Sequence, residues 1–139
     1  MTNSSNLPTV FLGGTVAKSQ WRQRLIPMLE INYFNPVVDD WNEAAVQTEL
    51  EHRQTDDYLL YVITPYMEGV YSIAELVDDS HRQPQRTVFT FLETDDDRAF
   101  TPHQLKSLHQ TAKLVSELGT HCFDTLEEVA HFLNHDWKK

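Results

Sequence analysis

The sequence predicts an α/β domain in which five parallel strands form a sheet covered by helices on both faces. Short apolar runs alternate along the chain with longer segments of helical spacing, as they do in this fold class. One run, residues 58–64, is apolar enough to indicate a buried strand. The length of 139 residues suits a single domain with one core, which we expect over residues 8–136.

The first three elements follow from spacing and from glycine and proline. Residues 9–12 are an apolar run that Gly13-Gly14 ends, so we expect the first strand there. A helix over about residues 19–31 is predicted next, because Trp21, Leu25, Met28 and Leu29 recur at helical spacing. Residues 33–35 form a short second strand that Pro36 stops.

The middle of the chain predicts a helix, a strand and a second helix. Residues 43–53 form a mostly polar helix, and residues 58–64 form the third strand. A turn at Gly69 leads into a helix with Ser72 and Glu75 at positions i and i+3, hence on one face. We expect the opposite face to pack on the core, through Ile73, Leu76 and Val77.

The last third adds two strands and two helices. The fourth strand is predicted over residues 86–92, and the acidic run Asp95 to Asp97 is interpreted as a solvated loop. Thr101 as N-cap and Pro102 at the first position begin the next helix, which Gly119 ends. A brief strand over residues 121–123 precedes a final helix, for which Asp124 or Thr125 is the expected cap.

This alternation predicts right-handed crossovers and the strand order 2-1-3-4-5, the flavodoxin-like (Rossmann-like) three-layer sandwich. In such sheets ligands bind beyond the carboxyl ends of the strands, at the switch point between strands 1 and 3. Three loops should converge there: residues 13–15, residues 35–42 and residues 67–75. They are rich in glycine, carboxylate and aromatic residues, which makes this edge the candidate site.

Composition limits the classes of partner. The formal net charge is −10, from 21 acidic and 11 basic residues, which disfavours binding to nucleic acid or to an anionic membrane surface. The single cysteine, Cys122, excludes an intrachain disulfide. No apolar stretch approaches the length of a membrane span. Residues 1–7 lack the features of a signal peptide, and we expect a disordered lead and a cytoplasmic protein.

At the three converging loops the chain resembles the nucleoside 2-deoxyribosyltransferase-like family. The resemblance spans about residues 9 to 92. The matching segments are Val10-Phe11-Leu12-Gly13-Gly14 with Trp21-Arg22, then Asn35-Pro36 with Asp39-Asp40-Trp41, and finally Ser72-Ile73-Ala74-Glu75.

The resemblance implies cleavage or transfer of the N-glycosidic bond of a (deoxy)nucleoside or nucleotide. Glu75 would attack C1′, and water or a second base would resolve the glycosyl-enzyme, while Asp40 or Asp39 serves the base. Such chemistry needs one carboxylate for the oxocarbenium-like centre and an acid for the leaving base. The expected substrate-binding residues are Phe11, Gly13, Gly14, Trp41, Met67, Gly69, Tyr71 and Ser72. The resemblance also implies a homodimer or larger assembly, and no metal or organic cofactor.

Other interpretations of these residues were weighed. A non-catalytic nucleotide-sensing domain would use the same pocket without the charge of Glu75, and Tyr71 and Val77 stand where family members often carry small residues. A phosphoacceptor receiver domain is excluded, because the first and third strands do not end in the acidic residues it requires. The pair His131 and His135 is interpreted as a solvated helix end rather than a metal site.

Overall fold

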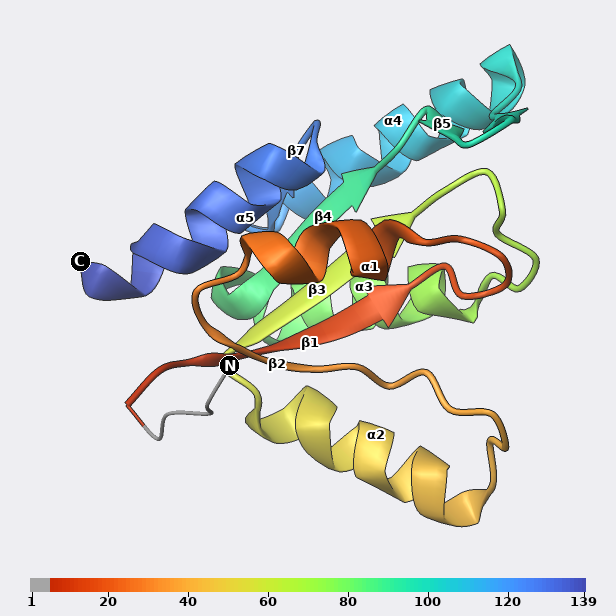
Figure 1. Cartoon of the computed structure of the whole chain (residues 1–139). Coiled ribbons are helices and arrows are strands. Elements are labelled where there is room, and N and C mark those ends of the chain that lie inside the picture. The colour runs from red at the N-terminus through yellow and green to blue at the C-terminus, as the bar shows by residue number, and fades with distance from the viewer. Residues whose placement is uncertain (1–5) are drawn as a thin grey trace.

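Five parallel strands form the central sheet of the computed structural model, which describes residues 6–139 (Figure 1). Their order is β2-β1-β3-β4-β7, and all four neighbouring pairs are parallel. The strands are β1 (Thr9–Gly14), β2 (Asn32–Phe34), β3 (Tyr58–Ile63), β4 (Thr87–Phe91) and β7 (His121–Phe123). The predicted order 2-1-3-4-5 of the main strands is therefore confirmed.

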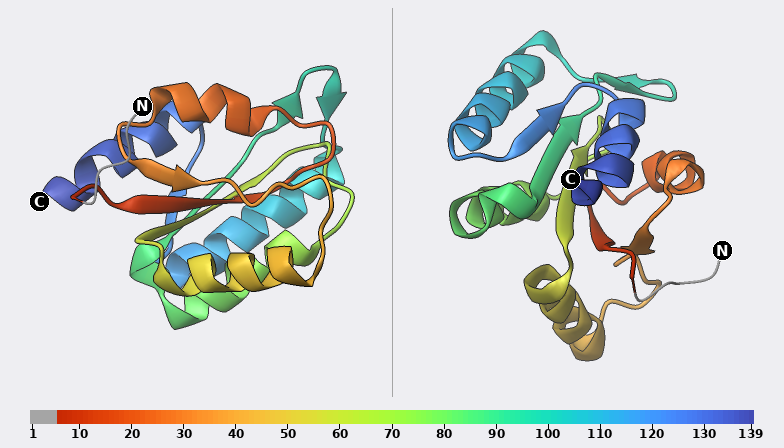
Figure 2. Two further views of the ribbon diagram at one scale, coloured as in Figure 1. Left: turned by 60° about the horizontal axis from the view of Figure 1, so that its bottom comes forward. Right: turned by 90° about the vertical axis from the view of Figure 1, so that its left-hand side faces the viewer.

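Helices cover both faces of the sheet (Figure 2). One layer contains α1 (Trp21–Leu25) and α5 (Leu126–His135), and the other contains α2 (Glu43–Thr55), α3 (Tyr71–Arg82) and α4 (Pro102–Glu117). Because side chains alternate between the faces of a strand, each central strand contributes to two cores. In β1, Val10 and Leu12 pack with α1 and α5, whereas Phe11 packs with α3 and α4.

Strand β1 is longer than predicted, because Gly13 and Gly14 belong to it and pair with β3. Gly14 has φ +121°, and a Cβ on it would overlap the backbone of Val62. Only glycine adopts this conformation without strain and permits so close an approach. Gly13 and Gly14 are thus required for the close packing of β1 against β3, whether or not a ligand is bound.

The first helix is shorter than the predicted 19–31. The α-helical part ends at Leu25, and a 3₁₀ turn follows at Ile26–Met28. Pro27 explains the difference, because proline has no backbone N–H to donate and its ring crowds the preceding turn. Strand β2 then begins at Asn32, one residue earlier than predicted.

The prediction that the acidic run Asp95 to Asp97 is a solvated loop is wrong for Asp95. Asp95 is 2% exposed and belongs to a β-hairpin formed by β5 (Thr94–Asp95) and β6 (Arg98–Ala99). Its carboxylate accepts a hydrogen bond from Ser19 Oγ at 2.5 Å and pairs with Arg24 at 3.3 Å. The hairpin thereby fastens the segment that leads from β1 into α1.

The helix starts are capped as the sequence indicates. The side chain of Thr101 caps α4, and that of Thr125, rather than Asp124, caps α5; each helix has a complete capping box. Of the disordered lead expected over residues 1–7, residues 1–5 lie outside the described part of the chain.

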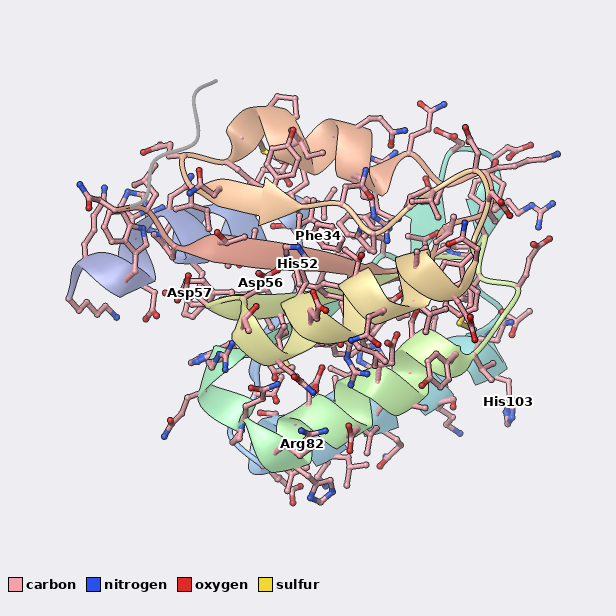
Figure 3. All side chains as sticks on the ribbon, turned by 90° about the horizontal axis from the view of Figure 1, so that it is seen from below. Phe34, His52, Asp56, Asp57, Arg82 and His103 are labelled. Carbon is pink, nitrogen blue, oxygen red and sulfur yellow. The ribbon has the colours of Figure 1, made fainter. Side chains whose placement is uncertain are left out.

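Helix α2 is mostly polar and packs beside β2 through an aromatic contact. The ring of His52 lies parallel to that of Phe34, with centroids 3.6 Å apart, and its Nδ1 is 2.9 Å from an oxygen of Asp56 (Figure 3). The next residue, Arg53, is buried. Helix α2 is thus fixed so that charged side chains, rather than an apolar stripe, face α3.

Candidate active site

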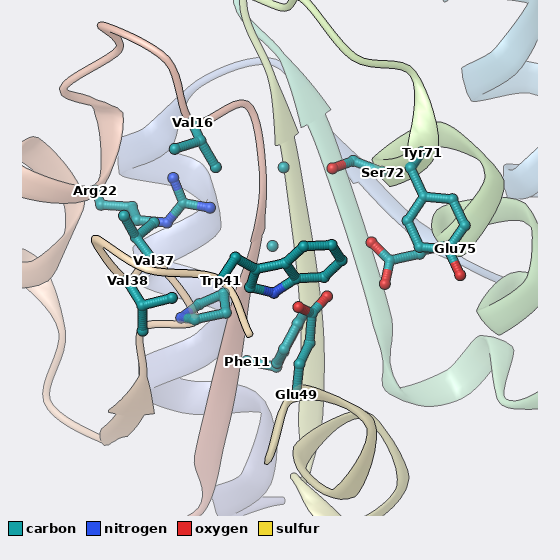
Figure 4. Close-up of a pocket in the computed structure, with 13 residues that line it drawn as sticks. Phe11, Val16, Arg22, Val37, Val38, Trp41, Glu49, Tyr71, Ser72 and Glu75 are labelled. Atoms are coloured by element: carbon teal, nitrogen blue, oxygen red, sulfur yellow. The ribbon is translucent and has the colours of Figure 1, made fainter. Parts of the chain in front are cut away.

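A cavity of about 250 Å³ lies at the carboxyl ends of β1 and β3 (Figure 4). Its walls come from the loops after β1 and β2, from the first turns of α3 and from α2, so the loops predicted to converge do so. The lining residues are Phe11, Gly13, Gly14, Val16, Arg22, Pro36, Val37, Val38, Trp41, Glu49, Tyr71, Ser72 and Glu75.

A second cavity of about 220 Å³ adjoins the first. The two share four lining residues, namely Gly14, Val16, Tyr71 and Ser72. Met67 and Gly69, expected from the sequence to bind substrate, line this second cavity. A ligand could therefore extend from one cavity into the other past the side chain of Ser72.

Most of the residues predicted for the site surround these cavities, and two do not. Phe11, Gly13, Gly14, Trp41, Tyr71, Ser72 and Glu75 line the first cavity. Asp39 and Asp40 are exposed and do not line either cavity, because the loop after β2 turns Val37, Val38 and Trp41 toward the site instead.

Glu75 is buried, with 6% of its surface exposed. The sequence placed it on the helix face opposite the core, but α3 buries Glu75 and Asp79 as well as Leu76. Burial is the largest cause that raises the pKa of Glu75, to about 8, and the negative charge of Glu49 raises it further. Glu75 is therefore not a solvated surface residue.

Glu49 of α2 is the site residue that sequence reasoning missed. Its carboxyl and that of Glu75 both line the first cavity, and its negative charge acts on Glu75 (Figure 4). Two carboxyls this close cannot both ionise easily, so one proton is retained to unusually high pH. The only signal in the sequence is the spacing of Glu49 and Arg53, which share one face of a polar helix.

Buried charges lie behind Glu75. Arg53 Nη1 is 3.4 Å from Glu75 Oε2, and Arg53 Nη2 is 3.1 Å from Asp79 Oδ1. Tyr61 donates its hydroxyl hydrogen to Asp79 Oδ2 at 2.5 Å. Burial, followed by the charge of Asp79, raises the pKa of Tyr61 above its ordinary value, so the hydroxyl remains a donor.

Arg22 of α1 supports the loop after β1. Its guanidinium donates to Leu12 O at 2.8 and 3.0 Å and to Thr15 O at 2.7 Å. Burial lowers the pKa of Arg22 to about 10, which leaves it charged at neutral pH. The cavity therefore has a cation on one wall and a pair of carboxyls on another.

The described residues give no indication of a metal centre or a membrane span. Within residues 6–139, no group of three or more His, Cys, Asp and Glu side chains is arranged to hold a metal ion. His131 and His135 are both exposed, and His135 Nδ1 is 2.7 Å from the carbonyl oxygen of His131. No helix in this part of the chain is long and apolar enough to cross a membrane.

Comparison with models of protein families gives a match over residues 7–96 to the family described as nucleoside 2-deoxyribosyltransferase like. The matched segment covers more than half of the chain and contains every residue that lines the two cavities. A separate search of curated proteins found no match. The description of the family indicates nucleoside glycosyl transfer at the family level. On the extent of this match, the chain belongs to the nucleoside 2-deoxyribosyltransferase-like family.

Proposed function

We propose that this protein cleaves or transfers the N-glycosidic bond of a (deoxy)nucleoside or nucleotide, with Glu75 as the nucleophile. The observation that carries the proposal is the buried carboxyl of Glu75 in the cavity wall, with the carboxyl of Glu49 in the same wall. Breaking an N-glycosidic bond requires both a carboxylate at C1′ and a proton for the departing base. A pair that retains one proton near neutral pH contains both groups.

The reaction follows from this pair. A carboxylate oxygen of Glu75 forms a bond to C1′ as the bond between C1′ and the base nitrogen breaks. The electron pair of that bond goes to the base, which takes the proton from Glu49. In the second step a water molecule or another base attacks C1′, Glu49 accepts the proton released by that nucleophile, and Glu75 leaves as a carboxylate. Glu75 is then again a carboxylate and Glu49 again carries its proton, as before the reaction.

Glu49 is better placed for this role than the residues that the sequence suggested. Asp40 or Asp39 was expected to serve the leaving base, but both are exposed and outside the cavity wall. Glu49 lines the same cavity wall as Glu75. We therefore assign the acid and base role to Glu49.

The rest of the cavity suits a nucleoside. Phe11 and Trp41 supply aromatic surface for a base, and Tyr71 and Ser72 lie at the start of α3 beside Glu75, where a sugar would sit. The adjoining cavity, with Met67 and Gly69, extends from the same point and would receive the 5′ end of the sugar. These assignments place C1′ next to Glu75.

The test is a panel of nucleosides and deoxynucleotides, incubated with and without a free acceptor base and followed by chromatography. We expect base release or exchange that disappears in Glu75→Gln and falls strongly in Glu49→Gln. Asp40→Asn should keep most of the activity, and it is the matched control because it removes an acidic charge outside the cavity. Full activity in Glu75→Gln would refute the proposal.

The alternative is a domain that binds nucleotides without acting on them, which the bulk of Tyr71, 65% exposed at the cavity, keeps in consideration. Thermal stabilisation by a nucleotide, equal in the wild type and Glu75→Gln and without base release, would favour that function. The homodimer or larger assembly implied by the family resemblance stays a prediction.

A further inference from the structure

The hairpin formed by β5 and β6 contacts both walls of the second cavity. One wall is the loop after β1, through residues 15–17, and the other is the loop after β3, through residues 67–69. The hairpin follows β4 and lies beside the segment that enters α1 (Figures 1 and 2). It is hydrogen-bonded to Ser19 and to Tyr66, each within two residues of one wall. The hairpin therefore connects two loops that are far apart in the sequence.

On the side of β1 this contact is buried. The carboxylate of Asp95 accepts a hydrogen bond from Ser19 Oγ at 2.5 Å and pairs with Arg24 at 3.3 Å. The backbone N–H of Ser19 donates to Val16 O at 3.0 Å, which closes the turn that follows β1. Asp95 thus holds a turn whose residues line the cavity.

Ala17 shows that this wall is held against the preference of its own backbone. Its φ is +32°, a conformation that residues with a Cβ rarely adopt. Such a conformation persists only where the surrounding structure imposes it. Ala17 lies inside the turn that Ser19 closes, and it lines the second cavity. The strained residue is therefore part of the cavity wall that Asp95 anchors.

On the side of β3 the contact comes from the hairpin turn. Tyr66 donates its hydroxyl hydrogen to Asp97 Oδ1 at 3.1 Å, and the guanidinium carbon of Arg98 lies 4.9 Å from the centre of the Tyr66 ring. The N–H of Met67, the next residue, donates to Thr64 O at 2.9 Å. Tyr66 thus lies in the turn that leads into the second wall at Met67.

We propose that this hairpin is a brace that sets the width of the second cavity, so that Asp95 and Asp97 limit the size of the group that a ligand places there. At their bases the two loops are joined directly, because the N–H of Thr64 donates to Thr15 Oγ1 at 2.9 Å. Beyond that point the hairpin joins them, and neither wall can move outward without breaking its contact with Asp95 or Asp97. That the group is the 5′ substituent of a sugar rests on the proposed function, whereas the brace does not.

Backbone hydrogen exchange in the ligand-free protein tests the brace without a substrate. Ser19→Ala removes the hydroxyl that Asp95 accepts from, and Tyr66→Phe removes the one that Asp97 accepts from. Because the hairpin joins the walls, each variant should speed exchange by about threefold or more in the loop that it does not alter. That loop is residues 66–70 for Ser19→Ala and residues 15–19 for Tyr66→Phe. Effects confined to the altered loop would overturn the proposal, and if one variant does not fold, the other decides.

Asp96→Asn is the matched control. Asp96 lies between Asp95 and Asp97, its side chain is exposed, and within residues 6–139 it forms no hydrogen bond or ion pair with either loop. Asparagine tolerates the φ of +52° at this position as aspartate does. The control removes an acidic charge and should leave exchange in both loops unchanged. Faster exchange in this variant, equal to that in Ser19→Ala, would refute the specific roles of Asp95 and Asp97.

Selectivity is the second test, and it uses one nucleoside with a 5′ hydrogen, hydroxyl, O-methyl or O-acetyl group. These groups carry no charge, so the carboxylate of Glu68 in the cavity wall does not dominate the comparison. The wild type should prefer the smaller groups, and Ser19→Ala and Tyr66→Phe should each reduce that preference in kcat/KM by about threefold or more. A purely structural role would lower kcat/KM equally for every group. Unchanged ratios in both variants, or a wild type without any preference, would overturn the proposal.

The two tests separate the brace from the proposed function. If the wild type releases no base, the exchange experiment still decides whether the hairpin couples the two walls. If base release requires Glu75 but neither exchange nor selectivity changes in the variants, the proposal for the hairpin fails and the proposed function stands.

Discussion

Replacing Glu75 by Gln should stabilise the protein at alkaline pH, even though it removes the proposed nucleophile. In the folded protein Glu75 retains its proton up to a pKa of about 8, whereas in the unfolded chain it loses the proton near pH 4.5. Between these values the native state binds more protons than the unfolded state. The free energy of unfolding of the wild type therefore falls as pH rises through this window.

The structure sets the size of the effect. Each pKa unit corresponds to about 1.4 kcal/mol, so the interval from 4.5 to about 8 gives about 5 kcal/mol as an upper value. Relaxation and water penetration reduce such energies, and we expect about 2 kcal/mol or more. The Gln variant, which has no second carboxyl to repel Glu49, should lack this loss. Its advantage over the wild type should grow from about pH 5 to pH 8 and then level off.

Urea denaturation of the wild type and Glu75→Gln at several values between pH 5 and pH 9 measures the difference. The control is Glu51→Gln, which removes an exposed carboxylate two residues from Glu49 on the same helix and should show no such trend. A constant difference across this range, or one that shrinks as pH rises, would refute the raised pKa of Glu75.

Three further predictions concern the scaffold and the cavity. Gly14→Ala should lower the free energy of unfolding by about 3 kcal/mol or more. Gly69→Ala should lower it by less than about 0.5 kcal/mol, because a Cβ at Gly69 has no heavy atom within 4 Å. Equal effects of the two variants in urea denaturation would contradict this. Asp95→Ala should cost about 2 kcal/mol because Ser19 and Arg24 lose the buried acceptor that they share. The exposed Asp97→Ala should cost little, and thermal melts compare the two variants. Trp41→Ala should raise KM about fivefold or more at unchanged Tm, and an unaltered KM would remove Trp41 from the substrate site.

The sequence was sufficient for the sheet, because its evidence is local. Each main strand is a short apolar run, and the right-handed crossover rule then orders them. Glu75 was found in the same way, from a strand, a turn and an amphipathic helix in succession. The main errors in the elements came from Pro27 inside a helical pattern and from glycines that continue a strand instead of ending it.

The rest of the site depends on contacts between distant segments. Helix α2 has no apolar stripe to show which side is buried, so nothing in its sequence directs Glu49 and Arg53 toward α3. The burial of Asp95 has no local signal, because its partner Ser19 is 76 residues away in the sequence. In the loop after β2, carboxylates and apolar side chains alternate within a few residues. Nothing local to this loop indicates that Trp41, and not Asp40, lines the cavity.

The central claim is a covalent bond between Glu75 and C1′ of the substrate sugar. Intact-protein mass spectrometry of a reaction quenched in acid, with a nucleoside that the panel shows to be cleaved, tests it most directly. The account predicts a mass increase equal to one glycosyl group, located on the peptide that contains Glu75 and absent from Glu75→Gln. Base exchange without any adduct on the wild type, or an adduct on another residue, would contradict it.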